Sequence, residues 1–279
     1  MLREIPIETF RATCRLAKIE NDCSLIMFRP MDESLDTPPQ PEHIEGLYDR
    51  LENWEKSLPP SLAIDRNRLP ENLSLRMHYY SIIIRMFNPF LLERSEPTNW
   101  TKGYSKRARN AVHKAQRELL HLIKVYGANH GWKDAMTMSF HMLNVAAFGC
   151  LDRLAPGSLL SDVEADTWYA DCIMCIRAIR EISNTFLVAQ AGLRTLATAV
   201  DRSSVELLPE DLVLFELYLS HGWTRTAVET IHSHWPLDLG VGMHSIEHSR
   251  LSVLIKKWGK LSAESNDSGS DSLGYSDSI

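Results

Sequence analysis

The chain has 279 residues, a hydrophobic fraction of 44% and a formal net charge of −6. This length and hydrophobic content suffice for a sizeable core in one large domain or two smaller ones. A charged fraction of 24% with a slight excess of acids argues against a protein that binds nucleic acid through its bulk charge.

The cysteines and the N-terminus indicate an intracellular protein. Five cysteines stand at irregular spacing, which predicts reduced thiols rather than a disulfide framework. The opening MLREIPIETF contains an acid and a proline where a signal peptide would need an apolar core. His, Arg or Asn interrupts the most apolar windows every few residues, so we expect no membrane span.

The first helix is expected over residues 7–28. Two apolar faces, each expected to be partly buried, follow helical spacing: Phe10, Cys14 and Ala17 on one side, and Leu16, Ile19 and Cys23 on the other. Pro30 ends the pattern, and the turn-rich sequence DTPPQPE (36–42) follows.

The second helix is strongly amphipathic. Its apolar positions, spaced by three and four residues, are Ile44, Leu47, Leu51, Trp54 and Leu58. Pro59 and Pro60 end it. The acids between these positions predict an acidic outer face, which comprises Glu42, Glu45, Asp49, Glu52 and Glu55.

The third helix, about 69–92, is apolar on nearly every side and is expected to lie at the centre of the core. It should begin after Pro70 and stop or kink near Asn88, because Pro89 follows. One narrow polar stripe, spaced by four, three and four residues, consists of Ser74, His78, Ser81 and Arg85. This stripe could face solvent, pair with an acidic neighbour, or line a ligand pocket between helices.

The rest of the chain predicts further helices. A fourth is expected over about 104–126 with Gly127 as its C-cap, and a fifth over 134–154. Ser161 and Glu164 form a capping box that opens the sixth. Further helical runs cover 186–200, 209 to before Gly222, 224–235 and 245–261.

These patterns predict an all-α fold, in which a bundle-like domain of many helices, residues 1–262, surrounds the third helix. No window alternates with the period of a β-strand. Residues 263–279 are acidic and rich in serine with almost nothing to bury, and we expect a disordered tail there.

The motif HSIEH matches the H-x-x-E-H pattern of one class of zinc peptidases, with His244 and His248 on one helix face. A catalytic zinc also needs a third protein ligand. The acids that follow lie at the helix end or in the tail, so surface histidines are the preferred interpretation. A zinc-dependent hydrolase is kept as a remote alternative.

Other motifs favour structure over chemistry. Cys172 and Cys175 form C-x-x-C, but in mid-helix with Ile176 and Ile179 on the same side, which indicates core packing. His232 and His234 are uninformative. The sequence LGVGMHS (239–245) lacks the third glycine of a dinucleotide-binding loop. We therefore predict no catalytic residue, no metal, no cofactor and no enzymatic activity.

The segment 101–117 carries a local charge of +6 and no acid. Its cations are Lys102, Lys106, Arg107, Arg109, Lys114 and Arg117. They could dock on the acidic helices of this chain, form a nuclear-import patch at 106–109, contact nucleic acid, or simply form a solvated face. No second basic element accompanies them, which makes direct DNA reading the least favoured use.

Taken in order, these features resemble the fungal-specific transcription factor domain, a helical region behind the Zn₂Cys₆ DNA-binding domain of fungal regulators. The family shows W-x-x-x-L-P-x-x-L and then a helix approximating L-H-M-x-Y-H-x-x-I-I-x-L-x-R-P-F. The matching positions here are Trp54, Leu58, Pro59, Leu62, Met77, Tyr79, Tyr80, Ile83, Pro89 and Phe90. Two residues depart from the family pattern. Arg76 stands where the family commonly has His, and Asn88 stands where it commonly has Arg.

The resemblance covers about residues 7–200, with most likeness to regulators resembling the nitrate-assimilation activators. It implies a nuclear location, with a cytoplasmic pool left open, and a role in transcription regulation. It would also imply a zinc cluster, but the five cysteines cannot supply the six that such a cluster needs. DNA binding is therefore expected only indirectly or through an N-terminal domain outside this chain.

The leading hypothesis is thus a regulatory domain that contacts the transcription machinery or a full-length regulator, and that could sense a small molecule. The alternative is a DNA-independent interaction protein that modulates a full-length regulator. A homodimer is left open, and so is whether the chain is a fragment or a stand-alone product.

Overall fold

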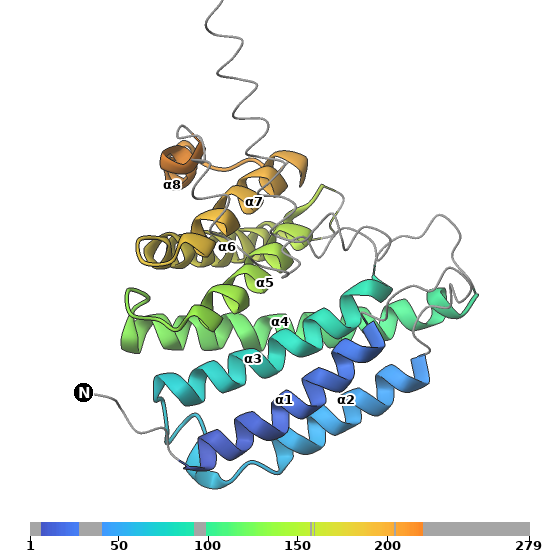
Figure 1. The fold of residues 1–279 in the computed structure, drawn as a ribbon. Helices are drawn as coiled ribbons and strands as arrows, with labels where there is room; N and C mark the ends of the chain where they lie inside the picture. The colour runs from blue at the N-terminus through green and yellow to red at the C-terminus, as the bar shows by residue number, and fades with distance from the viewer. Residues whose placement is uncertain are drawn as a thin grey trace, which may run out of the picture. The chain divides into compact units, whose positions relative to one another are not determined.

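The structure is a computed structural model that describes residues 7–27, 41–91, 99–156, 158, 160–203 and 205–219. Every regular element in these ranges is helical, which confirms the all-α prediction: there are eight α-helices and two short 3₁₀ helices (Figure 1). The helices predicted over 224–235 and 245–261 and the predicted disordered tail, 263–279, lie outside the described residues.

The chain divides into two compact units, Met1–Gly149 and Cys150–Ile279. The division falls inside α5 (Thr137–Leu154). The predicted domain boundary at residue 262 lies outside the described residues and stays a prediction.

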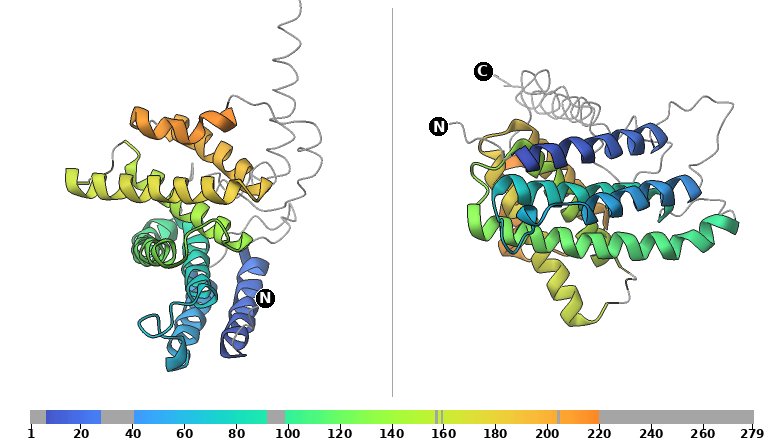
Figure 2. Two further views of the ribbon diagram at one scale, coloured as in Figure 1. Left: turned by 90° about the vertical axis from the view of Figure 1, so that its left-hand side faces the viewer. Right: turned by 90° about the horizontal axis from the view of Figure 1, so that it is seen from below.

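The first unit is built on four helices: α1 (Ile7–Met27), α2 (Pro41–Lys56), α3 (Pro70–Phe87) and α4 (Asn99–His130). They run side by side, and successive helices point in opposite directions (Figures 1 and 2). The connection between α2 and α3 contains the short 3₁₀ helix η1 (Pro60–Leu62), and a second one, η2 (Asn88–Phe90), follows α3.

Helix α3 lies at the centre of this unit, as its sequence predicts. It packs against α1, α2 and α4, and side chains on all sides of it are buried, including Leu73, Leu75, Met77 and Phe87. Pro70 occupies the first turn, where its missing N–H costs nothing. The α-helix ends at Phe87 and the chain continues as a 3₁₀ turn from Asn88, which confirms the end predicted near Asn88 from Pro89.

Helix α1 is buried along only one of its two apolar faces. On the face of Leu16, Ile19 and Cys23, Leu16 and Ile19 are 0% and 8% exposed. On the other face Phe10 is 58% exposed and Cys14 is also exposed, so the expectation that both faces are partly buried is wrong. Both α2 and α3 pack against α1, and the apolar side chains of α1 that are buried all lie on the Leu16 side: Ala12, Leu16, Ile19 and Cys23.

Helix α4 does not end at Gly127. It continues to His130, and Gly131, with φ of 66°, donates its N–H to the Gly127 carbonyl at 3.0 Å. That is the glycine cap of a helix end. Gly127 lies instead beneath Trp132, whose indole Nε1 would be 2.9 Å from an added Cβ.

The second unit contains α6 (Asp162–Ser183), α7 (Leu187–Ser203) and α8 (Pro209–Leu219), which pack against one another. The predicted capping box is confirmed: the Glu164 N–H donates to the Ser161 hydroxyl, and the Ser161 N–H donates to the Glu164 carboxylate. Asp211 joins α8 to α6 by accepting hydrogen bonds from Tyr169 at 3.0 Å and from Arg177 at 2.9 Å.

Candidate functional site

The predicted polar stripe of α3 faces an acidic residue of α1. His78 Nε2 lies 2.9 Å from a carboxylate oxygen of Glu20, and a guanidinium nitrogen of Arg85 lies 2.6 Å from the other. Sequence reasoning named the stripe but missed Glu20. The sequence feature that could have indicated Glu20 is its position one residue after Ile19, at the edge of the buried face of α1.

The two neighbours of Glu20 set its ionisation. Burial alone would raise its pKa, but the hydrogen bond and charge of His78 and the charge of Arg85 outweigh burial and lower the pKa to about 2. The carboxylate is therefore ionised at neutral pH and can only accept hydrogen bonds. It follows that His78 donates from Nε2–H.

The other two stripe residues are buried and take no part in this contact. The Ser81 hydroxyl donates to the His78 backbone carbonyl at 2.7 Å, and not to its imidazole. Ser74 is 4% exposed, and its hydroxyl has no hydrogen-bond partner among the described residues. Ser81 and His78 therefore do not form the hydroxyl–imidazole pair of a serine nucleophile.

A second histidine, which sequence reasoning did not single out, lies close to this cluster. His141 of α5 is 5% exposed. Burial lowers its pKa well below the usual range, and the positive charges of Arg85 and His78 lower the pKa further. His141 is thus neutral at physiological pH.

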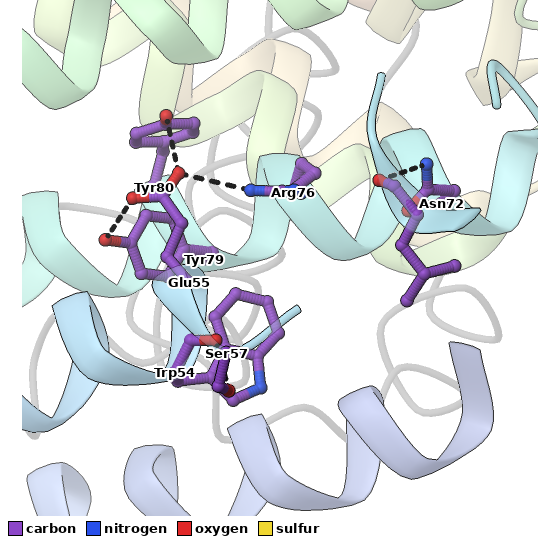
Figure 3. A network of polar contacts seen from close by, with 8 residues as sticks. Trp54, Glu55, Ser57, Asn72, Arg76, Tyr79 and Tyr80 are labelled. Carbon is purple, nitrogen blue, oxygen red and sulfur yellow. Dashed lines mark hydrogen bonds and ion pairs between the residues drawn. The ribbon is translucent and has the colours of Figure 1, made fainter. Parts of the chain in front are cut away.

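Three of the residues that carry the family resemblance, Trp54, Tyr79 and Tyr80, lie where α2 packs against α3 (Figure 3). The Trp54 indole N–H of α2 donates to the Ala12 carbonyl of α1 at 3.0 Å. The indole ring stacks on Tyr79 of α3, with ring centroids 5.3 Å apart. The motif therefore marks a structural contact among three helices.

Glu55, next to Trp54, accepts hydrogen bonds from three side chains of α3. These are Arg76 at 3.2 Å, Tyr79 at 3.1 Å and Tyr80 at 3.3 Å (Figure 3). Burial first, and then the charge of Glu55, raise the pKa of both tyrosines, so both stay protonated donors. Glu55 thus points inward, and the predicted all-acidic outer face of α2 is wrong at this position.

The basic segment lies at the start of α4, and one of its cations contacts α2. Arg107 pairs with Glu45 at 3.1 Å, and its guanidinium lies 4.8 Å from the centre of the Tyr48 ring. Tyr104 also donates to Glu45, at 2.6 Å. For Arg107, docking on the chain's own acidic helix is therefore observed.

The remaining cations of the segment point to solvent or are not described. The exposed ones are Lys106, Arg109, Lys114 and Arg117. The side chain of Lys102 lies outside the described residues. Arg107 pairs with Glu45 but its side chain stays 42% exposed, so the 106–109 patch presents Lys106, Arg107 and Arg109 at the surface, and its use for nuclear import stays a prediction.

Neither a metal cluster nor a membrane helix occurs in the part of the chain that the structure describes. Cys172 and Cys175 are buried on α6, 1% and 0% exposed, which fits their predicted packing role. No group of three or more potential metal ligands occurs among the described residues. No described helix is long and apolar enough to cross a membrane.

Several sequence motifs cannot be placed. His244 and His248 of the HSIEH motif, His232 and His234, and the 239–245 glycine sequence all lie outside the described residues. The small-molecule pocket at the α3 stripe also stays a prediction, although His78 and Arg85 are occupied by Glu20.

Comparison with known proteins gives one informative relative. The chain is 23% identical over 204 residues to the nitrogen assimilation transcription factor nirA of Emericella nidulans. The match covers 72% of this chain but only 22% of the relative. No family model and no solved structure matches the chain. The chain is thus distantly related to a fungal transcription factor.

Proposed function

We propose that this chain is a helical regulatory domain of a transcription regulator, which acts in the nucleus through contacts with other proteins. The observation that carries the proposal is the similarity to a nitrogen assimilation transcription factor across 72% of the chain. The packing of the motif residues supports it, since Trp54, Tyr79 and Tyr80 occupy structural positions and leave the outer helix faces for partners.

DNA binding is assigned to a domain outside this chain, or to a partner. The described residues support this division, because the cations at the start of α4 include Arg107, which is engaged with Glu45 and Tyr48. The domain would then influence transcription through protein contacts, with or without a small-molecule effector at the α3 stripe.

A tethering experiment tests the proposal. The full chain is fused to a foreign DNA-binding domain, and transcription is measured from a reporter that carries the matching sites. We expect a change in either direction relative to the foreign domain alone. The control is the same fusion with Phe87→Ala, which removes a core side chain that is 0% exposed and should abolish the effect by unfolding.

The opposite result has a clear meaning. A fusion that accumulates in the nucleus at the level of an active control, yet leaves reporter output unchanged, would contradict the proposal. If the untethered chain then altered the output of a full-length regulator and co-purified with it, the alternative of a DNA-independent modulator would replace the regulatory domain.

A further inference from the structure

The outer face of α1 is an apolar surface that no described residue covers. Ile7, Phe10 and Leu25 are 66%, 58% and 63% exposed. Cys14 and Ala17, which are also exposed, continue the surface between them. These residues, 7, 10, 14, 17 and 25, are called the α1 outer face below. It lies opposite the side on which Leu16 contacts the core.

The spacing of this face is that of a helix-packing seam. Ile7, Phe10, Cys14, Ala17 and then Asn21 follow one another at intervals of three, four, three and four residues. That alternation keeps the side chains on one line along a helix and is typical of a contact with a second helix. A solvated helix has no need of it, since single exposed apolar residues are otherwise scattered.

One edge of the face is basic. Arg11, Arg15 and Lys18 are exposed and form no ion pair with any described residue. Asp22, the acid four residues after Lys18 on the same edge, pairs with Arg50 of α2 at 2.6 Å, so these three cations have no acidic partner among the described residues. Unpaired cations beside an apolar seam favour a partner that brings acids to that edge.

This charge pattern decides between occupants. A second copy of α1 packed antiparallel on this face would place Arg11 and Lys18 beside the same cations of its mate, which is unfavourable. A neutral apolar helix would leave the three cations without counter-charges. An acidic amphipathic helix provides apolar side chains to pack on the seam and carboxylates to pair with the cations at its edge.

We propose that the α1 outer face binds an acidic amphipathic helix of another protein. Large apolar side chains of that helix pack against Phe10 and its neighbours, and its carboxylates pair with Arg11, Arg15 and Lys18. The inference deepens the proposed function by naming the chemistry of a partner. Its test measures binding directly, so that a failure here is distinguishable from a failure of the reporter assay.

The probe is a fluorescein-labelled synthetic helix with leucines at intervals of three and four and glutamates at most other positions. Fluorescence anisotropy measures its affinity for the purified full chain. We expect saturable binding that weakens as salt is added. Phe10→Ser should weaken it about tenfold, as for an anchor residue, and Arg11→Glu with Lys18→Glu should weaken it by a similar factor.

Matched variants separate this site from general attraction. Val163→Ser on α6 changes another exposed aliphatic residue, 76% exposed, and should leave binding unchanged. Arg109→Glu with Arg117→Glu changes two exposed cations of α4 and should have little effect. All these positions are on the surface, so circular dichroism should show unchanged folding.

Three outcomes would overturn the proposal. The first is no binding, or binding that the α4 variants weaken as much as the α1 variants do. The second is a dimer in sedimentation equilibrium that Phe10→Ser dissociates, which would assign the face to a second copy. The third is much tighter probe binding after Asp267, Asp271 and Asp277 are changed to Asn, which would assign it to the chain's own acidic tail.

Discussion

At the scale of single residues, two carboxylates join the outer helices of the first unit to α3. Glu20 of α1 lies between His78 and Arg85, and Glu55 of α2 accepts from Arg76, Tyr79 and Tyr80. Both acids are partly buried, where charge-assisted hydrogen bonds are stronger than at the surface. Removing either carboxylate would leave polar side chains of α3 without hydrogen-bond partners, which lowers the stability of the fold.

Glu20 makes stability depend on pH in the acid range. Folding lowers the pKa of Glu20 from 4.5 to about 2. The ionised carboxylate therefore stabilises the fold fully above the unfolded pKa of 4.5, and this stabilisation is lost as the pH falls to about 2. Glu20→Gln should cost roughly 1–3 kcal/mol at neutral pH. Urea unfolding across a pH series should show this deficit shrinking in acid, because the wild type loses the same interaction.

The control for Glu20 is Asp49→Asn, which changes an exposed acid of α2 and should leave the pH profile unaltered. An equal deficit for Glu20→Gln at neutral pH and near pH 2 would contradict the assigned role.

Glu55 should contribute more to the stability of the fold than an exposed acid of the same helix. Glu55→Ala removes the acceptor of Tyr79, Tyr80 and Arg76 and should lower the free energy of unfolding by roughly 1–3 kcal/mol. Asp49→Ala on the same helix should stay within about 0.5 kcal/mol of the wild type. Denaturant unfolding of both variants measures the difference in stability, and equal unfolding midpoints for the two variants would contradict the prediction.

At the scale of elements, α3 holds the unit together because neighbours contact it on several sides. Phe87 is 0% exposed and lies edge-on to Tyr48 of α2 at 5.3 Å and near Tyr104 of α4 at 6.2 Å. Each of these contacts joins α3 to a different helix, so a cavity here weakens two interfaces.

Phe87→Ala should therefore cost roughly 3–5 kcal/mol. The matched control is Phe10→Ala, at a position 58% exposed, which should cost little. Thermal unfolding followed by circular dichroism compares the two. Similar melting temperatures for both variants would show that α3 is not packed as described.

The pairing of α4 with α5 depends on a glycine. A Cβ added at Gly149 would lie 2.6 Å from the Gln116 carboxamide, which is itself buried and donates to the Ala146 carbonyl at 2.7 Å. Gly149→Ala should destabilise the chain by roughly 1–3 kcal/mol, because the buried carboxamide would have to shift and lose its hydrogen bond to Ala146.

A double-mutant cycle tests that explanation. Adding Gln116→Ala should make the cost of Gly149→Ala much smaller, which gives a coupling energy between the two sites. Gly46→Ala is the control, since a Cβ there meets nothing within 4 Å, and it should stabilise α2 by about 0.5–1 kcal/mol. Additive effects of the two substitutions would contradict the contact.

At the scale of the whole molecule, the family resemblance implies a six-cysteine zinc cluster that this chain cannot supply. Five cysteines cannot build a six-cysteine cluster, and Cys23, Cys150, Cys172 and Cys175 are buried. We expect the purified chain to contain no stoichiometric zinc by elemental analysis and to keep its melting temperature after treatment with a chelator.

The zinc expectation has a specific counter-result. Zinc at one equivalent, lost in a His244→Ala and His248→Ala variant, would restore the hydrolase alternative. Zinc lost only in cysteine variants would point to a metal site that the sequence pattern did not suggest.

The sequence by itself determined the existence of the helices that the structure describes, the capping box at Ser161 and the central place of α3, because these depend on spacing within one helix. Only the tertiary structure decided which α1 face is covered, and that Glu20 and Glu55 point inward. Those contacts join residues 58 and 24 positions apart, beyond the reach of helical periodicity. The structure also places the C-terminal glycine of α4 at Gly131, with φ of 66°, and not at Gly127, which lies beneath Trp132.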